Sequence, residues 1–371
     1  MKIAFVYDRV NKFGGAERVL LALHKIWPQA PLYTAVYNRE KAEWADVFKV
    51  NTTFLNRFSF MSDKHEILAL FTPVAFESLS FESYDIVLSI ASADAKGIST
   101  SPKTLHVCYC LTPTRYLWSG FDVYRQEPGV GLFNGFARSM MNYFFVPLRL
   151  WDYVAAQRPD YYIAISNHVA KRIRKYYNRY AQTLYPPVDT SVFRPKKTPS
   201  GNYFLVVSRL VPYKRIDYVI KAFNRIKKPL IIIGNGSDKS RLKSLAGKTI
   251  TFIDGNLTDE KLAWYYRKSR ALIFGGEEDF GLTSVEVQAC GRPVIALATG
   301  GVSESIIPSQ TGELYDIPTV DSLLAAVTRF EQKYYDSSKC TENARRFAKD
   351  TFQNGMKSTI EKLYKNWKKG I

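Results

Sequence analysis

The chain has 371 residues, of which 46% are hydrophobic and 23% are charged, and its formal net charge is +18 at pH 7. A chain of this length is too long to fold around one ordinary hydrophobic core and suits two domains. No apolar run reaches the length of a membrane-spanning helix, and the opening M-K-I-A-F-V-Y-D is typical of a strand rather than of a signal peptide. We therefore expect a cytoplasmic protein of two domains.

The positive charge is compatible with three kinds of partner: nucleic acid, an anionic membrane or phosphorylated substrates. We expect no nucleic acid, because the sequence shows neither a recognisable binding module nor a basic arm. Lys and Arg are instead mixed with aromatic residues, which make up 14% of the chain, and residues 133–157 are an example of this mixture. The mixture suits a peripheral surface on the inner face of the plasma membrane. A soluble basic protein with a core helix pair at 133–157 is the open alternative.

The four cysteines show no metal-ligand spacing, and with no secretion signal we expect buried free thiols in a reducing compartment. They are Cys108, Cys110, Cys290 and Cys340.

Short β-branched runs alternate with amphipathic stretches along the whole chain, which predicts an α/β fold with parallel sheets and crossover helices. The strands predicted in the first half are 2–7, 32–36, 86–90, 105–109, 161–165 and 183–185. Those in the second half are 203–208, 230–233, 250–253, 271–274 and 294–296. Helices are predicted between them, for example at 216–226 and 258–268.

Two adjacent prolines, Pro186 and Pro187, interrupt this pattern, and residues 186–201 are typical of a linker. We predict one Rossmann-like domain over 1–187 and a second over 188–352. We expect the last helix, within 353–371, to pack back on the first domain. Ligands of such sheets bind beyond the carboxyl ends of the strands, so the cleft between two facing domains is the expected site.

Two features of the first half are candidates for binding or chemistry. Gly14 and Gly15 open the helix after the first strand and allow a phosphate or sugar to approach backbone amides closely; a packing role is the open alternative. Asp94 lies in a loop after strand 86–90, where a carboxylate can orient or deprotonate an acceptor hydroxyl. A helix or turn cap is the alternative for Asp94. His106 is a poor candidate because it lies inside strand 105–109.

The segment S-R-L-V-P-Y-K-R-I-D begins where strand 203–208 ends. Arg209 and Lys214 flank a proline turn that can aim both cations at one place. Two fixed cations beside a leaving diphosphate offset the charge that develops as a glycosidic bond breaks, and no metal is then needed. The alternative is that Lys214 is a solvated residue at a helix start.

The segment E-D-F-G-L-T-S-V-E places two carboxylates, Glu278 and Glu286, eight positions apart around a Phe-Gly-Leu turn. Glu278 lies among other acids in a glycine-flanked loop, where hydroxyl donors of a sugar would satisfy it. For Glu286 two interpretations are open: a ligand contact, or the acid of a capping box formed by Thr283 to Glu286.

The order of these motifs resembles family 4 of the retaining glycosyltransferases, which have the GT-B fold, from residue 2 to about residue 367. The resemblance implies that Arg209 and Lys214 hold the diphosphate, that Glu278 meets the donor sugar or its phosphate side, and that Glu286 meets the ribose. It further implies substrate contacts from the 279–282 turn, from the Gly14–Gly15 pair and from the glycine loop near the nucleobase. The residues of that turn and loop are Asp279, Phe280, Gly281, Leu282 and Gly234.

This chain departs from the family at one position. Many relatives have a histidine after the strand that here is 105–109, whereas this sequence has C-Y-C-L-T-P, with Leu111 at that position. In a front-face mechanism the departing phosphate oxygen itself takes the acceptor proton, so the loss of the imidazole need not abolish activity.

The resemblance is strongest to bacterial mannosyltransferases of O-antigen or capsule assembly. It implies transfer of mannose from GDP-mannose to a glycan or lipid-linked acceptor, with no metal and no cofactor. A catalytically inactive nucleotide-sugar-binding protein of the same fold and a sugar-nucleotide epimerase are the alternatives.

Overall fold

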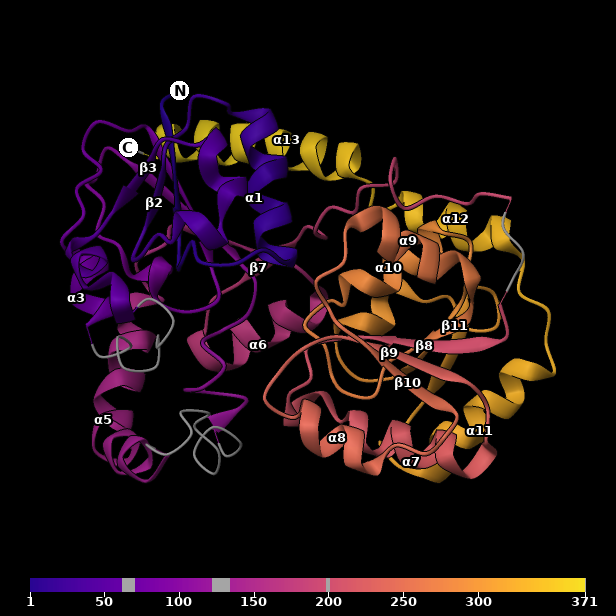
Figure 1. Ribbon diagram of the computed structural model, residues 1–371. Helices are drawn as coiled ribbons and strands as arrows, with labels where there is room; N and C mark the ends of the chain where they lie inside the picture. The colour runs from indigo at the N-terminus through magenta and orange to yellow at the C-terminus, as the bar shows by residue number, and fades with distance from the viewer. Residues whose placement is uncertain (62–70, 122–133, 198–200, 371) are drawn as a thin grey trace. The chain divides into compact units, whose positions relative to one another are not determined.

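The computed structural model describes residues 1–61, 71–121, 134–197 and 201–370. The chain divides into two compact units (Figure 1): unit 1 comprises Met1–Tyr185 with Gln353–Ile371, and unit 2 comprises Pro186–Phe352. Each unit contains one sheet in which every strand pair is parallel. The α/β fold with two parallel sheets is therefore confirmed.

The sheet of unit 1 has the strand order β3-β2-β1-β4-β5-β6-β7. Its central strands β1, β4 and β5 are buried along their whole length, as expected for parallel strands covered on both faces. The strands are β1 Ile3–Tyr7, β2 Leu32–Thr34, β3 Val50–Thr52, β4 Ile86–Ala91, β5 Leu105–Cys110, β6 Tyr161–Ala164 and β7 Ala181–Thr183.

The helices of unit 1 include the last helix of the chain, α13, which lies beside α1 in Figure 1. The Gln353 side chain donates to the carbonyl oxygen of Ala22 in α1 at 3.0 Å, and the Tyr364 hydroxyl lies 3.2 Å from an Asp85 carboxylate oxygen. The helices of this unit are α1 Gly15–Ile26, α3 Thr72–Glu77, α5 Asn134–Ala155, α6 Asn167–Tyr177 and α13 Lys349–Lys369. Short 3₁₀ turns join them, among them η4 Asp94–Gly97.

The sheet of unit 2 has the order β10-β9-β8-β11-β12-β13. Its strands are β8 Tyr203–Val207, β9 Leu230–Ile233, β10 Ile250–Ile253, β11 Ser269–Ile273, β12 Val294–Leu297 and β13 Gly312–Tyr315. Helices α7 Ile216–Ile226, α8 Lys239–Leu245 and α11 Val320–Glu331 cover one face (Figure 1). Helices α9 Asp259–Lys268, α10 Leu282–Ala289 and α12 Ser337–Arg345 cover the other. The core includes Phe204, whose ring centroid lies 5.2 Å from that of Phe223 and 5.8 Å from that of Phe330.

The structure corrects three local predictions. Strands β3 and β13 were not predicted, because β3 has only three residues and β13 begins at a glycine. The last strand of unit 1 is Ala181–Thr183 rather than 183–185. The stretch predicted as a linker is part of unit 2: Val188 pairs with Ala348, and Phe193 is buried with its ring 5.8 Å from that of Tyr266. All four cysteines are buried and free, as predicted.

Candidate functional site

Most of the predicted site residues lie near the topological switch points of the two sheets. In unit 2 the switch falls between β8 and β11, and in unit 1 it falls between β1 and β4. In open α/β sheets, ligands bind beyond the carboxyl ends of the strands at such a point, because the connections from the two neighbouring strands diverge there. Arg209 and Lys214 follow β8, and Glu278 follows β11; Gly14 follows β1, and Asp94 follows β4.

At the switch point of unit 2 the structure brings Lys214 and Glu278 together. Lys214 ends the 3₁₀ turn η6 Pro212–Lys214, and its Nζ forms an ion pair with Glu278 Oε2. The side chains are only 9% and 17% exposed, so both charges lie at the margin of solvent, where an ion pair is stronger than on an open surface. Lys214 is therefore not the solvated helix-start residue of the alternative interpretation.

Glycines allow the loops after β8 and β11 to touch. A Cβ added at Gly275 would lie 2.6 Å from the Arg215 carbonyl oxygen, and one at Gly276 would lie 2.9 Å from that of Lys214. A third loop joins them: the Gly301 amide donates to the Glu278 carbonyl oxygen at 2.7 Å, and Gly300 has a φ of 87°. Any side chain at these positions would push the loops apart and separate Lys214 from Glu278.

Arg209 precedes Lys214 in the same loop, and its side chain is exposed. One Nη donates to the Tyr213 hydroxyl at 2.6 Å, and Lys214 Nζ lies 5.1 Å from the centroid of the Tyr213 ring. Tyr213 therefore contacts both cations. Gly234 follows β9 and lies close to the same strand end, because a Cβ there would be 1.9 Å from the Ser208 carbonyl oxygen.

The turn that follows Glu278 leads into the N-terminus of α10. Gly281 is the N-cap residue of α10, with a φ of 83° and no side-chain cap, and Leu282 is the first helical residue. The Phe280 side chain is buried with its ring 5.4 Å from that of Phe347. Phe280 can therefore offer a ligand only its backbone, whereas the amides of the turn carry the partial positive charge of a helix N-terminus.

Glu286 is not the acid of a capping box, and this alternative is wrong. The helix begins at Leu282, so Thr283 lies inside it rather than at its N-cap. The Glu286 carboxylate is almost fully buried and accepts a hydrogen bond of 2.8 Å from the Tyr266 hydroxyl of α9. The sequence suggested a capping box because Thr283 and Glu286 have the right spacing. In the structure, however, Gly281 is the N-cap residue, so Thr283 cannot cap the helix.

At the switch point of unit 1, Asp8 fixes the loop that contains Asp94. One oxygen of Asp8 accepts from the amides of Ser92 and Ala93 at 2.7 and 3.0 Å, and the other accepts from the Ala95 amide at 2.8 Å. Because several amides converge on one carboxylate, this loop is held tightly to the end of β1. The sequence prediction missed Asp8, whose position directly after β1 was its only signal.

Asp94 itself is only 2% exposed, and it accepts a short hydrogen bond from the Thr72 hydroxyl of α3. Burial raises the pKa of Asp94 from its ordinary value of 3.8 to about 6, even though the nearby charge of Lys96 and the bond from Thr72 oppose the shift. A carboxyl group with this pKa exchanges its proton close to neutral pH, which is a property expected of a general base.

A buried ion pair lies next to Asp94, and sequence reasoning missed it too. Lys96 Nζ lies 2.5 Å from Asp152 Oδ1, and both side chains are at most 2% exposed. The Thr114 hydroxyl and the Trp118 indole nitrogen donate to the same carboxylate at 2.6 and 2.7 Å. Asp152 lies on α5 and Lys96 on η4, so this pair joins the long helix to the Asp94 loop.

The Gly14–Gly15 pair opens α1, as predicted, but a carboxylate is already present there. A Cβ at Gly14 would lie 3.3 Å from Glu17 Oε2, and the other Glu17 oxygen accepts from the Tyr7 hydroxyl at 2.5 Å. Burial raises the pKa of Glu17. An anionic ligand at these glycines would therefore meet a carboxyl group that is easier to protonate than usual.

His106 does not replace the missing histidine. It is fully buried within β5, its Nε2 lies 2.8 Å from the Ser89 hydroxyl of β4, and burial lowers its pKa to about 3. Leu111 follows the end of β5, where its amide donates to the Ala91 carbonyl oxygen at 2.8 Å. Its side chain has no proton to exchange, so it provides no acid or base at this position.

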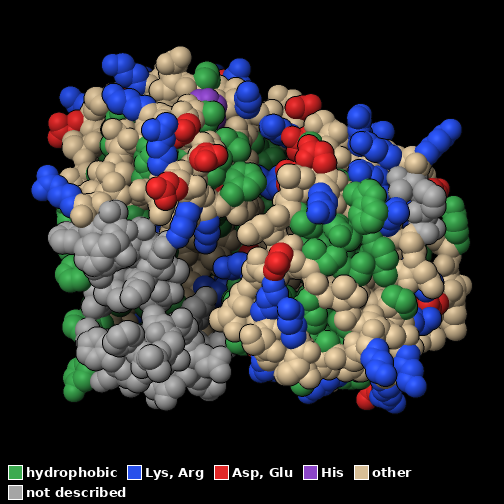
Figure 2. All heavy atoms as spheres, viewed as in Figure 1, with side chains coloured by type: hydrophobic (Ala, Val, Ile, Leu, Met, Phe, Trp, Pro, Cys, Tyr) green, Lys and Arg blue, Asp and Glu red, His purple; other side chains and the backbone are tan. Residues whose placement is uncertain are grey.

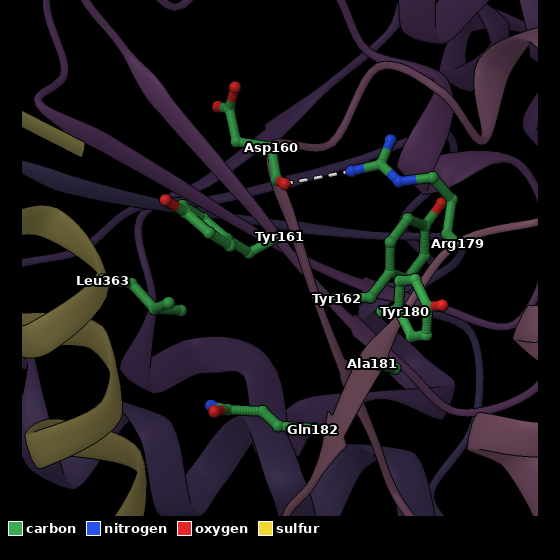
Figure 3. Close-up of a pocket in the computed structure, with 8 residues that line it drawn as sticks. All are labelled: Asp160, Tyr161, Tyr162, Arg179, Tyr180, Ala181, Gln182 and Leu363. Atoms are coloured by element: carbon green, nitrogen blue, oxygen red, sulfur yellow. Dashed lines mark hydrogen bonds between the residues drawn. The ribbon is translucent and has the colours of Figure 1, made fainter. Parts of the chain in front are cut away.

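A cavity of about 480 Å³ in unit 1 lies at the other end of the sheet (Figure 3). Asp160 and Tyr161 lie at the start of β6, Tyr180 and Ala181 lie at the start of β7, and Leu363 points toward the cavity from α13. These positions are the amino ends of the strands. None of the predicted site residues lines this cavity.

Helices α3 and α5 of unit 1 present exposed apolar side chains. The two helices are in contact, because the Trp151 indole nitrogen donates to Glu77 at 2.9 Å. We call the following exposed residues the apolar patch: Phe71, Val74, Tyr143, Phe144, Val146, Leu150, Tyr153 and Val154. Phe133 and the side chains of 134–142 lie outside the described part of the predicted 133–157 surface. Among the residues described, none of the helices combines the length and the apolar composition that a bilayer crossing requires.

The chain is similar in sequence to glycosyltransferases. The family model described as Glycosyl transferases group 1 matches residues 188–347. A D-inositol 3-phosphate glycosyltransferase of Mycobacteroides abscessus is 32% identical over 158 residues, which are 37% of this chain and 35% of that protein. An uncharacterized glycosyltransferase of Methanocaldococcus jannaschii is 24% identical over 214 residues, or 57% of this chain and 60% of that protein. The chain thus spans about a third of the mycobacterial relative.

Solved structures resemble the whole chain. Sucrose-phosphate synthase from Thermosynechococcus elongatus has a TM-score of 0.72 at 17% identity, covering 99% of this chain and 100% of that one. HepE of Anabaena in complex with UDP has a TM-score of 0.70 at 15% identity, covering 98% and 100%. The lipopolysaccharide outer core galactosyltransferase WaaB has a TM-score of 0.66 at 19% identity, covering the same shares. The fold is GT-B, as predicted.

Proposed function

We propose that this chain is a retaining glycosyltransferase, which moves a sugar from a nucleotide diphosphate sugar to a glycan or lipid-linked acceptor without a metal ion. The observation that supports the proposal most is the Lys214–Glu278 ion pair at the switch point of unit 2. A cation, an acid and a helix N-terminus meet there, and these groups suit a diphosphate joined to a polyhydroxylated ring.

Each group of this site has a proposed role toward the donor. Arg209 and Lys214 hold the diphosphate and offset the charge that develops on it as the glycosidic bond breaks. Glu278 moves from Lys214 to the hydroxyls of the sugar, and the amides of the 279–282 turn bind the phosphate or the sugar. Glu286 meets the ribose from α10, and the Gly234 loop lies near the nucleobase.

The reaction is proposed to take place on one face of the sugar. The bond from the anomeric carbon to the phosphate oxygen breaks, and the acceptor oxygen forms its bond to the same carbon from the same side. The departing phosphate oxygen takes the acceptor proton, so the configuration is retained without an enzyme nucleophile. Asp94 orients the acceptor hydroxyl from unit 1, where its carboxyl group exchanges a proton near neutral pH.

GDP-mannose is the proposed donor, on the basis of the resemblance to bacterial mannosyltransferases. UDP-sugars are the second candidate, because UDP is bound in the structure of HepE. The apolar patch of α3 and α5 is proposed to rest on an anionic membrane of the cytoplasmic face and to bring a lipid-linked acceptor to unit 1. Lys and Arg side chains are spread over the face shown in Figure 2, and such charges favour an anionic surface.

The test is a transfer assay of the full chain with GDP-mannose, UDP-glucose and UDP-galactose, with and without EDTA. We expect release of the nucleoside diphosphate from one donor, an α-configured product from an α-configured donor, and the same rate with EDTA. Binding without turnover of any donor would instead identify an inactive nucleotide-sugar-binding protein. Conversion of the sugar nucleotide without transfer would identify an epimerase.

A further inference from the structure

A second cavity, of about 190 Å³, lies within unit 2 away from the donor loops. It is lined by Ser191, Val192, Arg194, Lys196, Glu260 and Arg267. Arg194 and Lys196 precede β8, and Arg267 is at the end of α9, directly before β11. These basic residues therefore belong to the amino-terminal side of the sheet. The loops that hold Lys214 and Glu278 lie at the carboxyl ends of the same strands.

Arg267 is a buried cation whose side chain contacts the Cys290 thiol. It is 6% exposed, its Nε has no hydrogen-bond partner, and one Nη makes a long contact of 3.4 Å with the Arg194 carbonyl oxygen. Across residues 1–61, 71–121, 134–197 and 201–370, no carboxylate lies within ion-pair distance of its guanidinium. The neighbouring Cys290 thiol stays neutral, because burial raises its pKa to about 12.

Two buried lysines, Lys96 and Lys214, differ from Arg267 in this respect. Lys96 faces Asp152 and Lys214 faces Glu278. A buried charge without a counterion is strongly destabilising, so Arg267 in the lining of this cavity points to an anion that the protein itself does not supply. The other charges at the cavity also favour an anion: Arg194 and Lys196 are cations, and the exposed Glu260 is the one acid among the described residues that line it.

We propose that this cavity binds a phosphoryl anion, with Arg267 at its base and Arg194 and Lys196 at its mouth. A guanidinium fork matches the oxygens of a phosphate in pairs, and two further cations suit its double charge. The volume lies below the roughly 300 Å³ at which pockets for drug-sized ligands begin. The cavity therefore holds a phosphate or a diphosphate group rather than a whole nucleotide sugar.

The proposal does not rest on the donor site, and its test keeps the two apart. Pyrophosphate is titrated by calorimetry into the full chain carrying Lys214→Ala, which weakens any binding at the donor loops. In this background the Arg194→Ala/Lys196→Ala pair should lower pyrophosphate affinity tenfold or more, on the order expected when charged partners are removed. The matched control is Lys248→Ala, an exposed lysine of the same unit outside the cavity, which should leave the affinity unchanged.

Arg267→Gln provides the second measurement. Without anion, its melting temperature should equal or exceed that of the parent chain, because the uncompensated charge is gone, and pyrophosphate should no longer raise it. If this variant does not fold, the Arg194→Ala/Lys196→Ala variant still tests the proposal, because both of its residues are exposed. A parallel titration with vesicles of anionic phospholipid separates a lipid headgroup from a free phosphate as the source. The proposal is overturned if neither probe binds, or if binding does not depend on Arg194 and Lys196.

Discussion

The two switch points use acidic residues in opposite ways. In unit 2, Glu278 pairs with Lys214 at the margin of solvent, and three glycine-containing loops hold this pair in place. In unit 1, both carboxylate oxygens of Asp8 accept hydrogen bonds from backbone amides, and the buried Asp94 accepts one from the Thr72 hydroxyl. The charged pair of unit 2 thus lies at the margin of solvent, whereas the carboxylates at the switch point of unit 1 fix a loop. The proposed function places the donor at unit 2, and Asp94 of unit 1 keeps two interpretations: a residue that orients the acceptor or a structural residue.

The largest expected effect separates these two interpretations. If Asp94 orients the acceptor hydroxyl, Asp94→Asn should lower the transfer rate about 10²- to 10⁴-fold, the usual range for a positioned acid or base. Donor affinity should stay the same, because the proposed donor contacts come mainly from unit 2. Asp46→Asn, which removes an exposed carboxylate paired with Arg39 in the same unit, is the control. A folded Asp94→Asn protein with normal transfer would leave Asp94 a purely structural role.

The buried pair Lys96–Asp152 should matter for stability rather than for chemistry. Lys96→Met leaves Asp152 buried without its cation, which should lower the free energy of unfolding by about 3–5 kcal/mol. Combining it with Asp152→Leu should restore a large part of that loss, since no unpaired charge then remains. Denaturant unfolding of the two single variants and the double variant measures this coupling. Additive losses would show that the two residues do not act as a pair.

The cations of unit 2, in contrast, should matter for the chemical step rather than for stability. Arg209→Ala and Lys214→Ala are each expected to lower transfer about 10²- to 10³-fold, the usual cost of removing one preorganised group that meets developing charge. Lys248→Ala is the matched control for loss of a lysine on the same unit. Steady-state kinetics with the preferred donor measures the effect. Wild-type turnover in both variants would remove the diphosphate role from these residues.

The pKa of Asp94 predicts a pH dependence of stability. Its pKa is about 6 in the folded chain against an ordinary 3.8, so folding takes up a proton between these values. The free energy of unfolding should therefore fall as the pH rises through this window, by up to about 3 kcal/mol. Asp94→Asn lacks this proton, so its stability relative to the parent chain should increase from pH 4 to pH 7. A difference that stays constant with pH would show that the carboxyl group has an ordinary pKa.

The smallest expected effect concerns the membrane. The chain should bind anionic vesicles more strongly than neutral ones, by about 1 kcal/mol for each well-placed cation, and added salt should weaken the binding. Leu150→Ser, in the apolar patch, should weaken it further, whereas Ile317→Ser removes an exposed apolar residue of unit 2 and should not. Vesicle sedimentation measures both. Equal partition to neutral and anionic vesicles would argue against the proposal.

Local patterns in the sequence predicted most of the fold. Continuous apolar runs such as 86–90 predicted the central strands. The sequence placed Lys214 and Glu278 each after a strand, but the ion pair between them was not predicted, because only sugar hydroxyls were considered as partners of Glu278. The short strand β3 was missed because three half-buried residues carry little pattern. Asp8, Lys96 and Asp152 were missed for another reason. Their partners are distant in sequence. The identity of a charged residue alone does not predict that it is buried, because burial depends on a partner that only the folded chain brings close.

The central claim is that the Lys214–Glu278 site of unit 2 binds a nucleotide diphosphate sugar. Calorimetric titration of GDP, and of the preferred donor, into the parent chain, Lys214→Ala and Lys248→Ala tests it most directly. We predict saturable binding to the parent chain and to Lys248→Ala, with affinity at least about tenfold lower for Lys214→Ala. Equal affinities for all three proteins, or no binding of any nucleoside diphosphate or nucleotide sugar to the parent chain, would contradict the account.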